Sequence, residues 1–175
     1  SHHQVSPWDL ARLHMKQKIK PMQSAVEHHF KRAFNNKSLS TSSVTENLLR
    51  HTILKNIVPA SSDDLDKIEG NILFSLSKEK HSLSWLKRLE VGDLVYSDNC
   101  LTRPYIGAKL DYAKNPRTKT TKDSTRILVH FDFLPPISKE KEVEILTEFK
   151  MIIKSFTKAK ISTVILSKKK PECVL

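Results

Sequence analysis

Aromatic side chains recur at strand-like spacing in the second half of the chain, with acidic residues beside them. A methylated lysine keeps its charge but loses most of its hydration, so two to four aromatic faces and an acid can hold it. Because residues i and i+2 of a strand share a face, neighbouring aromatics can lie together while the residue between them points away. The alternative is that these rings only pack a core. The residues concerned are Tyr96, Tyr105, Tyr112, Phe131 and Phe133, with Asp98 and Asp132 as the acids.

A second candidate is the basic stretch over 114–122, which carries four Lys or Arg residues and three threonines. Each cation placed on a phosphate backbone releases condensed counterions, and threonine hydroxyls can add hydrogen bonds to phosphate. No base-reading motif is visible, so we expect sequence-independent contact with DNA. The alternative is a solvated, mobile loop. The expected DNA-binding residues are Lys109, Lys114, Arg117, Lys119, Lys122 and Arg126.

Composition restricts the remaining functions. The net charge of +11 favours a polyanionic partner, and the alternative is a merely solubilising surface. Only three glycines are present, which argues against Gly-rich phosphate loops. Histidine and cysteine spacings fit no zinc site, no nucleophile elbow frames a catalytic set, and no run approaches the roughly 20 apolar residues of a membrane span. We therefore expect no enzyme activity, metal, cofactor, small-molecule substrate or membrane partner.

Two smaller features leave alternatives open. The acids Asp63, Asp64, Asp66 and Glu69 could bind a metal, but they are better explained as the start of a helix, where negative charge is favoured. The two cysteines indicate no disulfide framework, which fits a reducing compartment.

Capping residues and apolar spacing predict helices in the N-terminal part. A helix over 6–20 is expected, with a kinked continuation over 22–34. Its basic residues could bind nucleic acid or a partner, or they could face solvent while its apolar residues pack. Ser43 with Glu46 forms a capping box that starts another helix, and Pro59 ends it.

The C-terminal part is expected to hold one long helix over 138–158. Ser138 can cap it, and its acids come early and its lysines late, as the helix dipole favours. Its apolar residues recur at helical spacing and predict one buried stripe. The expected stripe is Val143, Leu146, Phe149, Ile153 and Phe156.

Alternating or continuous apolar runs predict the strands. They lie at 72–76, 94–96, 104–113 and 161–166, and a further strand ends at 131–133. Short strands joined by turns over 89–133 indicate a small, strongly bent antiparallel sheet.

Three motifs in this segment carry a family resemblance. They are Val-Gly-Asp-Leu-Val at 91–95, Tyr-Ile-Gly-Ala-Lys-Leu at 105–110 and Ile-Leu-Val-His-Phe-Asp-Phe at 127–133. Together they resemble the Tudor-like domains of chromatin readers, closest to those of DNA-damage checkpoint adaptors. The resemblance implies an SH3-like barrel and a nuclear location. It also implies a methyl-lysine cage, with Tyr105 and Phe131 at the family's cage positions and Tyr96 and Phe133 beside them.

The expected fold class is α+β. A helical N-terminal region over 6–58 packs with a small Tudor/SH3-like barrel over 70–167, which includes the helix 138–158. The expected function is that of a non-catalytic, chromatin-associated module that contacts DNA and a histone tail, as in a checkpoint or repair adaptor. Two alternatives stay open: a protein–protein interaction domain without a ligand pocket, and an RNA-binding part of a ribonucleoprotein.

Overall fold

The computed structural model describes residues 25–83, 85–102, 104–108 and 113–174. Its helices are α2 (Ala25–Phe34), α3 (Val44–Asn56) and α4 (Lys139–Thr157), with two one-turn 3-10 helices, η1 (Leu65–Lys67) and η2 (Pro116–Thr118). Its strands are β1 (Ala60–Asp64), β2 (Leu73–Leu76), β3 (His81–Leu83), β4 (Leu86–Leu89), β5 (Leu94–Ser97), β6 (Tyr105–Ala108), β7 (Ala113–Lys114) and β8 (Ile127–Phe131).

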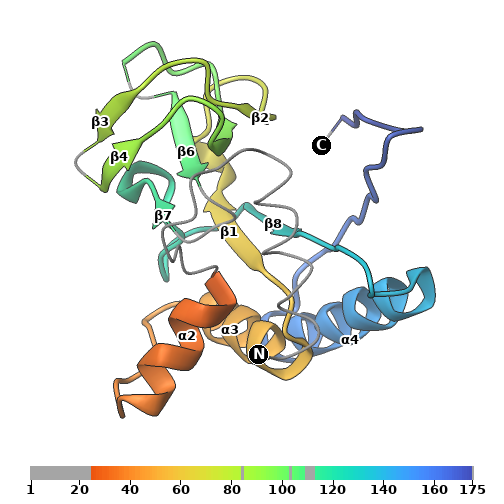
Figure 1. Ribbon diagram of the computed structural model, residues 1–175. Coiled ribbons are helices and arrows are strands. Elements are labelled where there is room, and N and C mark those ends of the chain that lie inside the picture. Colours follow the sequence, from red (N-terminus) through yellow and green to blue (C-terminus); the bar gives the residue numbers. More distant parts are fainter. Residues whose placement is uncertain (1–24, 84, 103, 109–112, 175) are drawn as a thin grey trace.

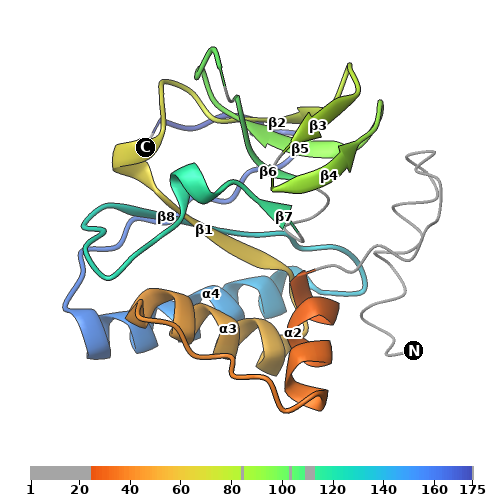
Figure 2. The ribbon, with the colours of Figure 1, turned by 90° about the vertical axis from the view of Figure 1, so that its left-hand side faces the viewer.

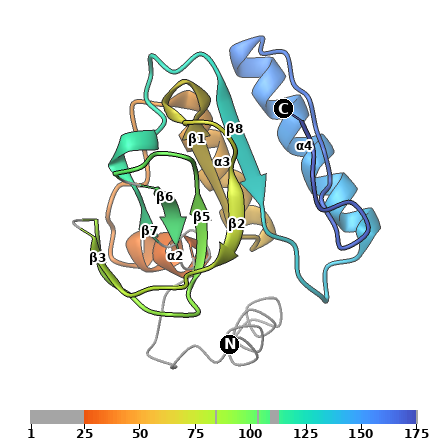
Figure 3. The ribbon, with the colours of Figure 1, turned by 90° about the horizontal axis from the view of Figure 1, so that it is seen from above.

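The elements form layers. The three helices make one side of the molecule, β1 and β8 lie across them, and β2 to β6 gather at the opposite end (Figures 1 and 2). Seen from above, β8 lies between β1 and α4 (Figure 3). The helix expected over 6–20 lies outside the described residues.

Local capping explains where α3 and α4 begin and end. The Ser43 side chain accepts a hydrogen bond from the Glu46 N–H, and the Ser138 side chain accepts one from the Lys141 N–H. Ile57 closes α3 in the left-handed conformation, with its own N–H donating to the Ile53 carbonyl. These caps confirm both predicted helix starts.

One hydrophobic core joins the helices to the β1–β8 sheet. Phe149 and Ile153 of α4 belong to the same cluster as buried residues of α2, α3 and β1, so the expected helix 138–158 shares its core with the N-terminal helices. Within α4 the buried residues are Ile145, Phe149 and Ile153, whereas Val143 and Phe156 of the expected stripe are exposed. The buried members of this core are Val26, Leu49, Ile53, Ala60, Phe149 and Ile153.

Strand β1 is polar in sequence, yet all five of its residues are buried. It pairs antiparallel with β8, from Ala60 opposite Phe131 to Asp64 opposite Ile127. An unpaired polar group in such a position costs about 1–3 kcal/mol, so this strand needs partners for its side chains. Asp63 and Asp64 were expected to start a helix, so the sequence did not predict this strand.

The remaining strands form open sheets. The larger one has the order β2-β5-β6-β7, and β3 pairs with β4 in a separate hairpin. A small second core of Leu89, Val95 and Ala108 lies against the larger sheet, with Trp85 and Tyr105 packed on it.

The α+β class is therefore confirmed, as are strands within 72–76 and over 94–97. Three details differ from expectation. The single strand expected over 104–113 is instead two strands, β6 and β7, which pair antiparallel with each other. Strand β8 pairs with β1 and not with β5 or β6, so the described strands do not close into a barrel. Residues 161–166 form no strand, although their composition favours one.

Candidate nucleic-acid interface

The basic loop over 114–126 is fastened to β1 by a buried ion pair. Lys114 Nζ lies 3.0 Å from Asp63 Oδ2, and the same ammonium group donates to the Ser62 carbonyl. Thr118 Oγ1 donates to the other oxygen of Asp63 at 2.7 Å. The Asp63 side chain is 1% exposed, so this cation and this hydroxyl replace the water that the carboxylate loses.

A second ion pair holds the middle of the loop. Arg117 Nη2 donates to Asp98 Oδ2 at 2.7 Å, and its Nη1 donates to the Lys67 carbonyl at 2.6 Å. Asp98 also accepts the backbone N–H groups of Glu69 and Cys100, at 3.0 and 3.2 Å. The guanidinium fork therefore ties the loop to two separate segments.

Hydroxyl groups complete the attachment. Ser124 Oγ donates to Asp64 Oδ2 at 2.6 Å, and Lys67 Nζ lies 3.1 Å from the same oxygen. Burial alone would raise the pKa of Asp64, but the hydrogen bonds from Ser124 and Lys67 outweigh it and hold that pKa below its ordinary value. The Ser62 and Thr120 hydroxyls are 2.8 Å apart. These contacts supply side-chain partners for Ser62, Asp63 and Asp64 of the buried polar strand.

Of the expected DNA-binding residues, Lys114 and Arg117 thus face inward to carboxylates. Lys119 and Lys122 are exposed, and no ion pair or hydrogen bond of either ammonium group is found within the described part of the chain. Arg126 is exposed and lies 3.2 Å from Asp66. Lys109 lies outside the described residues.

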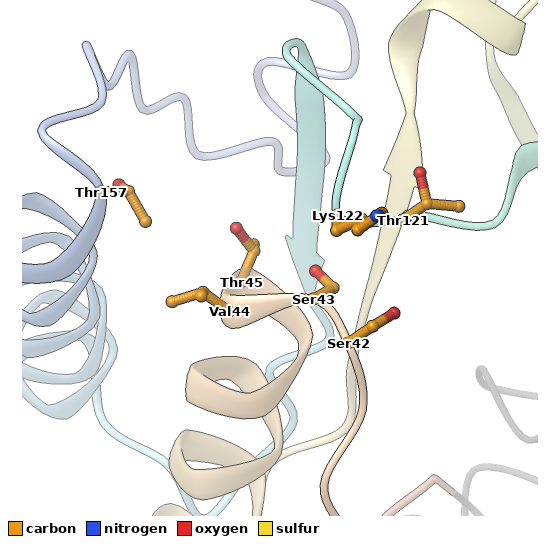
Figure 4. Close-up of a pocket in the computed structure, with 7 residues that line it drawn as sticks. All are labelled: Ser42, Ser43, Val44, Thr45, Thr121, Lys122 and Thr157. Atoms are coloured by element: carbon orange, nitrogen blue, oxygen red, sulfur yellow. The ribbon is translucent and has the colours of Figure 1, made fainter.

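A shallow hollow of about 200 Å³ lies beside this loop, at the start of α3. Figure 4 shows Ser43, Thr45 and Lys122 grouped there, with Thr157 at the end of α4 on the far side. Hydroxyl groups, one ammonium group and no carboxylate line it, which suits an anion better than a cation. The lining residues are Ser42, Ser43, Val44, Thr45, Thr121, Lys122 and Thr157.

The four residues expected to form a methyl-lysine cage lie in three different environments. Phe131 stacks with Phe133 at 6.0 Å and meets Phe149 of α4 edge-on at 5.2 Å, on the helical side. Tyr105 packs on the second core. Tyr96 contacts His130, whose side chain points to the opposite face of β8 from Phe131. The structure therefore does not bring these four side chains together: α4 packs on one face of β8, and Tyr96 packs on the other.

A different aromatic group is present, and the sequence reading missed it. Phe74, Tyr96 and His130 stack in succession, and the Tyr96 hydroxyl donates to Asp132 Oδ1 at 2.8 Å. Phe74 and Tyr96 are directly paired across β2 and β5, so correct strand pairing would have found the first contact. The contact between Tyr96 and His130 could be predicted only from the position of β8 in the fold.

The acidic residues over 63–69 interact with basic residues of the same chain. The Asp64 side chain accepts from the Asp66 N–H and caps η1, in agreement with the expected helix start. Among the described residues, no three His, Cys, Asp or Glu side chains are arranged to hold a metal ion. Both cysteines are free thiols, with Cys100 buried. No described helix has the length and hydropathy to cross a bilayer.

Comparison with known proteins gives no relative. No protein-family model, no curated protein and no solved structure matches this chain. Function is therefore argued from the geometry of the chain itself.

Proposed function

We propose that this protein is a non-catalytic module that binds the phosphate backbone of nucleic acids through the loop over 114–126. The observation that carries the proposal is the division of the loop's cations. Lys114 and Arg117 bind buried carboxylates, whereas Lys119 and Lys122 are exposed without an acidic partner in the described structure.

The inward-facing cations matter because they fix the loop. A flexible lysine-rich loop loses conformational entropy when it binds, and this loss reduces affinity. Here two ion pairs and the hydrogen bonds of Thr118 and Ser124 hold the backbone in place before any ligand arrives. The two exposed ammonium groups are then presented from a rigid base.

The surroundings favour an anion. The hollow beside Lys122 adds hydroxyl groups from Thr45 and Thr121, and Lys158 directly follows its Thr157 wall. The chain as a whole carries +11, which steers polyanions toward it over about a Debye length. The sequence contains no base-reading motif, so the proposed binding is sequence-independent.

The more specific version, a nuclear chromatin-associated module with DNA as its partner, rests on the Tudor-like resemblance of the segment 89–133. Histone-tail reading is not part of this proposal, because the four expected cage residues are not gathered.

The test is a charge reversal at the two exposed lysines. Lys119→Glu with Lys122→Glu should weaken binding to a DNA duplex at least tenfold near physiological salt. It should also lower the slope of log K against log salt by roughly 0.9 per lost phosphate contact. The matched control is Lys31→Glu with Lys37→Glu on and after α2, where both lysines are equally exposed.

Fluorescence anisotropy over a salt series measures both quantities. Because the control carries the same change in net charge, it separates a local site from general attraction. Equal losses in the two double variants, or no loss at Lys119 and Lys122, would contradict the proposal.

A further inference from the structure

Three aromatic rings form a continuous stack that crosses from one sheet to another. The ring centroids of Phe74 and Tyr96 are 4.6 Å apart with an interplanar angle of 28°. Those of Tyr96 and His130 are 4.3 Å apart with an angle of 32°. These spacings are short for aromatic pairs, which commonly lie 4.5–7 Å apart. The stack is therefore close-packed from β2 to β8.

The middle ring is held on every side. Tyr96 lies on β5, between β2 and β6, and its hydroxyl donates to Asp132 Oδ1 at 2.8 Å. Because Phe74 is packed against this fixed ring, its own orientation is set before any ligand binds. Strand β2 is an edge of its sheet, so no described strand covers the outer side of the stack.

The outermost ring is open. Phe74 has one face against Tyr96 and remains 49% exposed. Leu76, which shares a face of β2 with Phe74, is also exposed, and residues 70–77 carry no charged side chain. In a chain of net charge +11, β2 is therefore an uncharged edge strand with an exposed aromatic ring.

We propose that Phe74 stacks on a base of single-stranded nucleic acid, and that the backbone of the same strand is bound by the exposed lysines. This inference rests on the proposed phosphate binding and adds the substrate class. A base in a duplex has both faces covered by its neighbours, whereas a base in a single strand offers a free face to an aromatic ring. Such stacking tolerates any base, in keeping with the lack of a base-reading motif in the sequence.

Net charge favours this occupant over a strand from a second copy of the protein. An exposed apolar edge strand can also pair with another chain. A second copy of this protein, however, would bring another +11 charges to the contact, while a nucleic acid strand brings the opposite charge. Self-association through β2 is treated as an outcome of the test.

The experiment compares a single-stranded thymine oligonucleotide with an abasic oligomer of equal length, which keeps the phosphates and lacks the bases. Phe74→Ala should weaken binding of the thymine oligonucleotide by roughly 5- to 150-fold, the range that corresponds to one stacked base. It should leave binding of the abasic oligomer unchanged. Phe74→Trp should restore affinity, and Phe74→Leu, which keeps an apolar side chain, should not. Phe34→Ala is the control, because Phe34 is an 83% exposed aromatic on α2.

The outcomes separate the two proposals. If the wild-type protein binds both oligomers equally and Phe74→Ala alters neither, stacking is overturned and phosphate binding stands. If neither oligomer binds but the DNA duplex does, the stacking inference is overturned and phosphate binding stands; if none of the three binds, the proposed function falls and the stacking inference falls with it. Sedimentation of each variant covers the remaining case: self-association that Phe74→Ala abolishes, with oligonucleotide affinity unchanged, would show that a second copy covers β2 and would overturn the inference.

Discussion

Lys114 Nζ lies 3.0 Å from Asp63 Oδ2, and this one ion pair joins the basic loop to the buried polar strand β1. The two ends of the pair differ in environment: the Asp63 side chain is 1% exposed and that of Lys114 is 25% exposed. The Lys114 side chain therefore covers the Asp63 carboxylate and shields it from water. Sequence alone predicts that Lys114 contacts DNA, whereas in the structure Lys114 stabilises the fold.

The first prediction follows from that burial. Lys114→Met should lower the free energy of unfolding by about 3–5 kcal/mol, because it leaves Asp63 as an uncompensated buried charge. Natural domains are stable by only about 5–15 kcal/mol, so the change is large. Urea denaturation at neutral pH measures it.

Lys122→Met, at an exposed lysine of the same loop, is the control and should shift stability by no more than about 0.5 kcal/mol. The double variant Asp63→Asn with Lys114→Met should lose less than the sum of the single losses, because removing both charges leaves none unpaired. A Lys114→Met protein as stable as the Lys122→Met protein would show that the pair does not hold the loop.

The second prediction concerns Arg117, which donates to Asp98 and to the Lys67 carbonyl through two nitrogens of one planar group. A lysine can place its single ammonium group at only one of these acceptors. Arg117→Lys should therefore cost about 1.5–3 kcal/mol, the contribution of a hydrogen bond to a charged group. The measurement is again denaturant unfolding.

Arg126→Lys provides the comparison, because Arg126 faces Asp66 in a pair whose side chains are 69% and 48% exposed. Exposed pairs contribute about 0–1 kcal/mol, so this variant should resemble the wild type. If the two Arg-to-Lys variants lost equal stability, the proposed anchoring role of Arg117 would be untenable.

The parts that the sequence predicted correctly are those with local causes. Ser43 and Ser138 cap helices because each hydroxyl accepts from an N–H three residues later, and no tertiary contact is needed. Likewise Leu94, Val95 and Tyr96 form an apolar run that is a strand by composition alone.

The parts that escaped prediction depend on residues distant in the chain. Ser61 to Asp64 have polar side chains typical of a turn, and they form a buried strand because β8 pairs with them and because Lys114, Thr118 and Ser124 reach Asp63 and Asp64 from the loop. The role of Phe131 was likewise undecidable from its neighbours, since β-strand alternation gives two faces without saying which one α4 covers. The candidate site could not be predicted from the sequence for the same two reasons, because these distant contacts place its loop and its aromatic side chains.

The third prediction is a dependence of stability on pH that arises at His29. Burial, followed by the charges of Arg50, His28 and Arg32, lowers the pKa of His29 from 6.5 to about 4. Between these two values the unfolded chain binds a proton that the folded protein does not, so stability rises with pH in this window. It should fall as the pH drops from about 7 toward 4, with a slope below about 1.4 kcal/mol per pH unit.

His29→Leu removes this titrating group and should reduce the slope of the stability profile between pH 6.5 and pH 4.5, leaving the contribution of His28, whose pKa is also lowered by burial. Denaturant midpoints at one-unit pH steps give the comparison, and a histidine NMR titration of the wild type reports the pKa directly. His51→Leu, at an exposed histidine of α3, is the control and should keep the wild-type slope. A wild-type slope in the His29→Leu protein would place the pH dependence elsewhere.

The fourth prediction separates the two contacts of Tyr96. Tyr96→Phe keeps the ring between Phe74 and His130 and removes only the hydroxyl that donates to Asp132. Asp132 has other interactions, so the loss should be modest, about 1 kcal/mol in the free energy of unfolding. Affinity for a single-stranded oligonucleotide should stay within about twofold of the wild type, because binding depends on the stack and not on the hydroxyl.

Tyr96→Leu removes the ring that orients Phe74 and should weaken oligonucleotide binding while leaving binding of the abasic oligomer unaffected. If Tyr96→Phe and Tyr96→Leu reduced oligonucleotide affinity equally, the hydrogen bond to Asp132, and not the stacked rings, would be what positions Phe74.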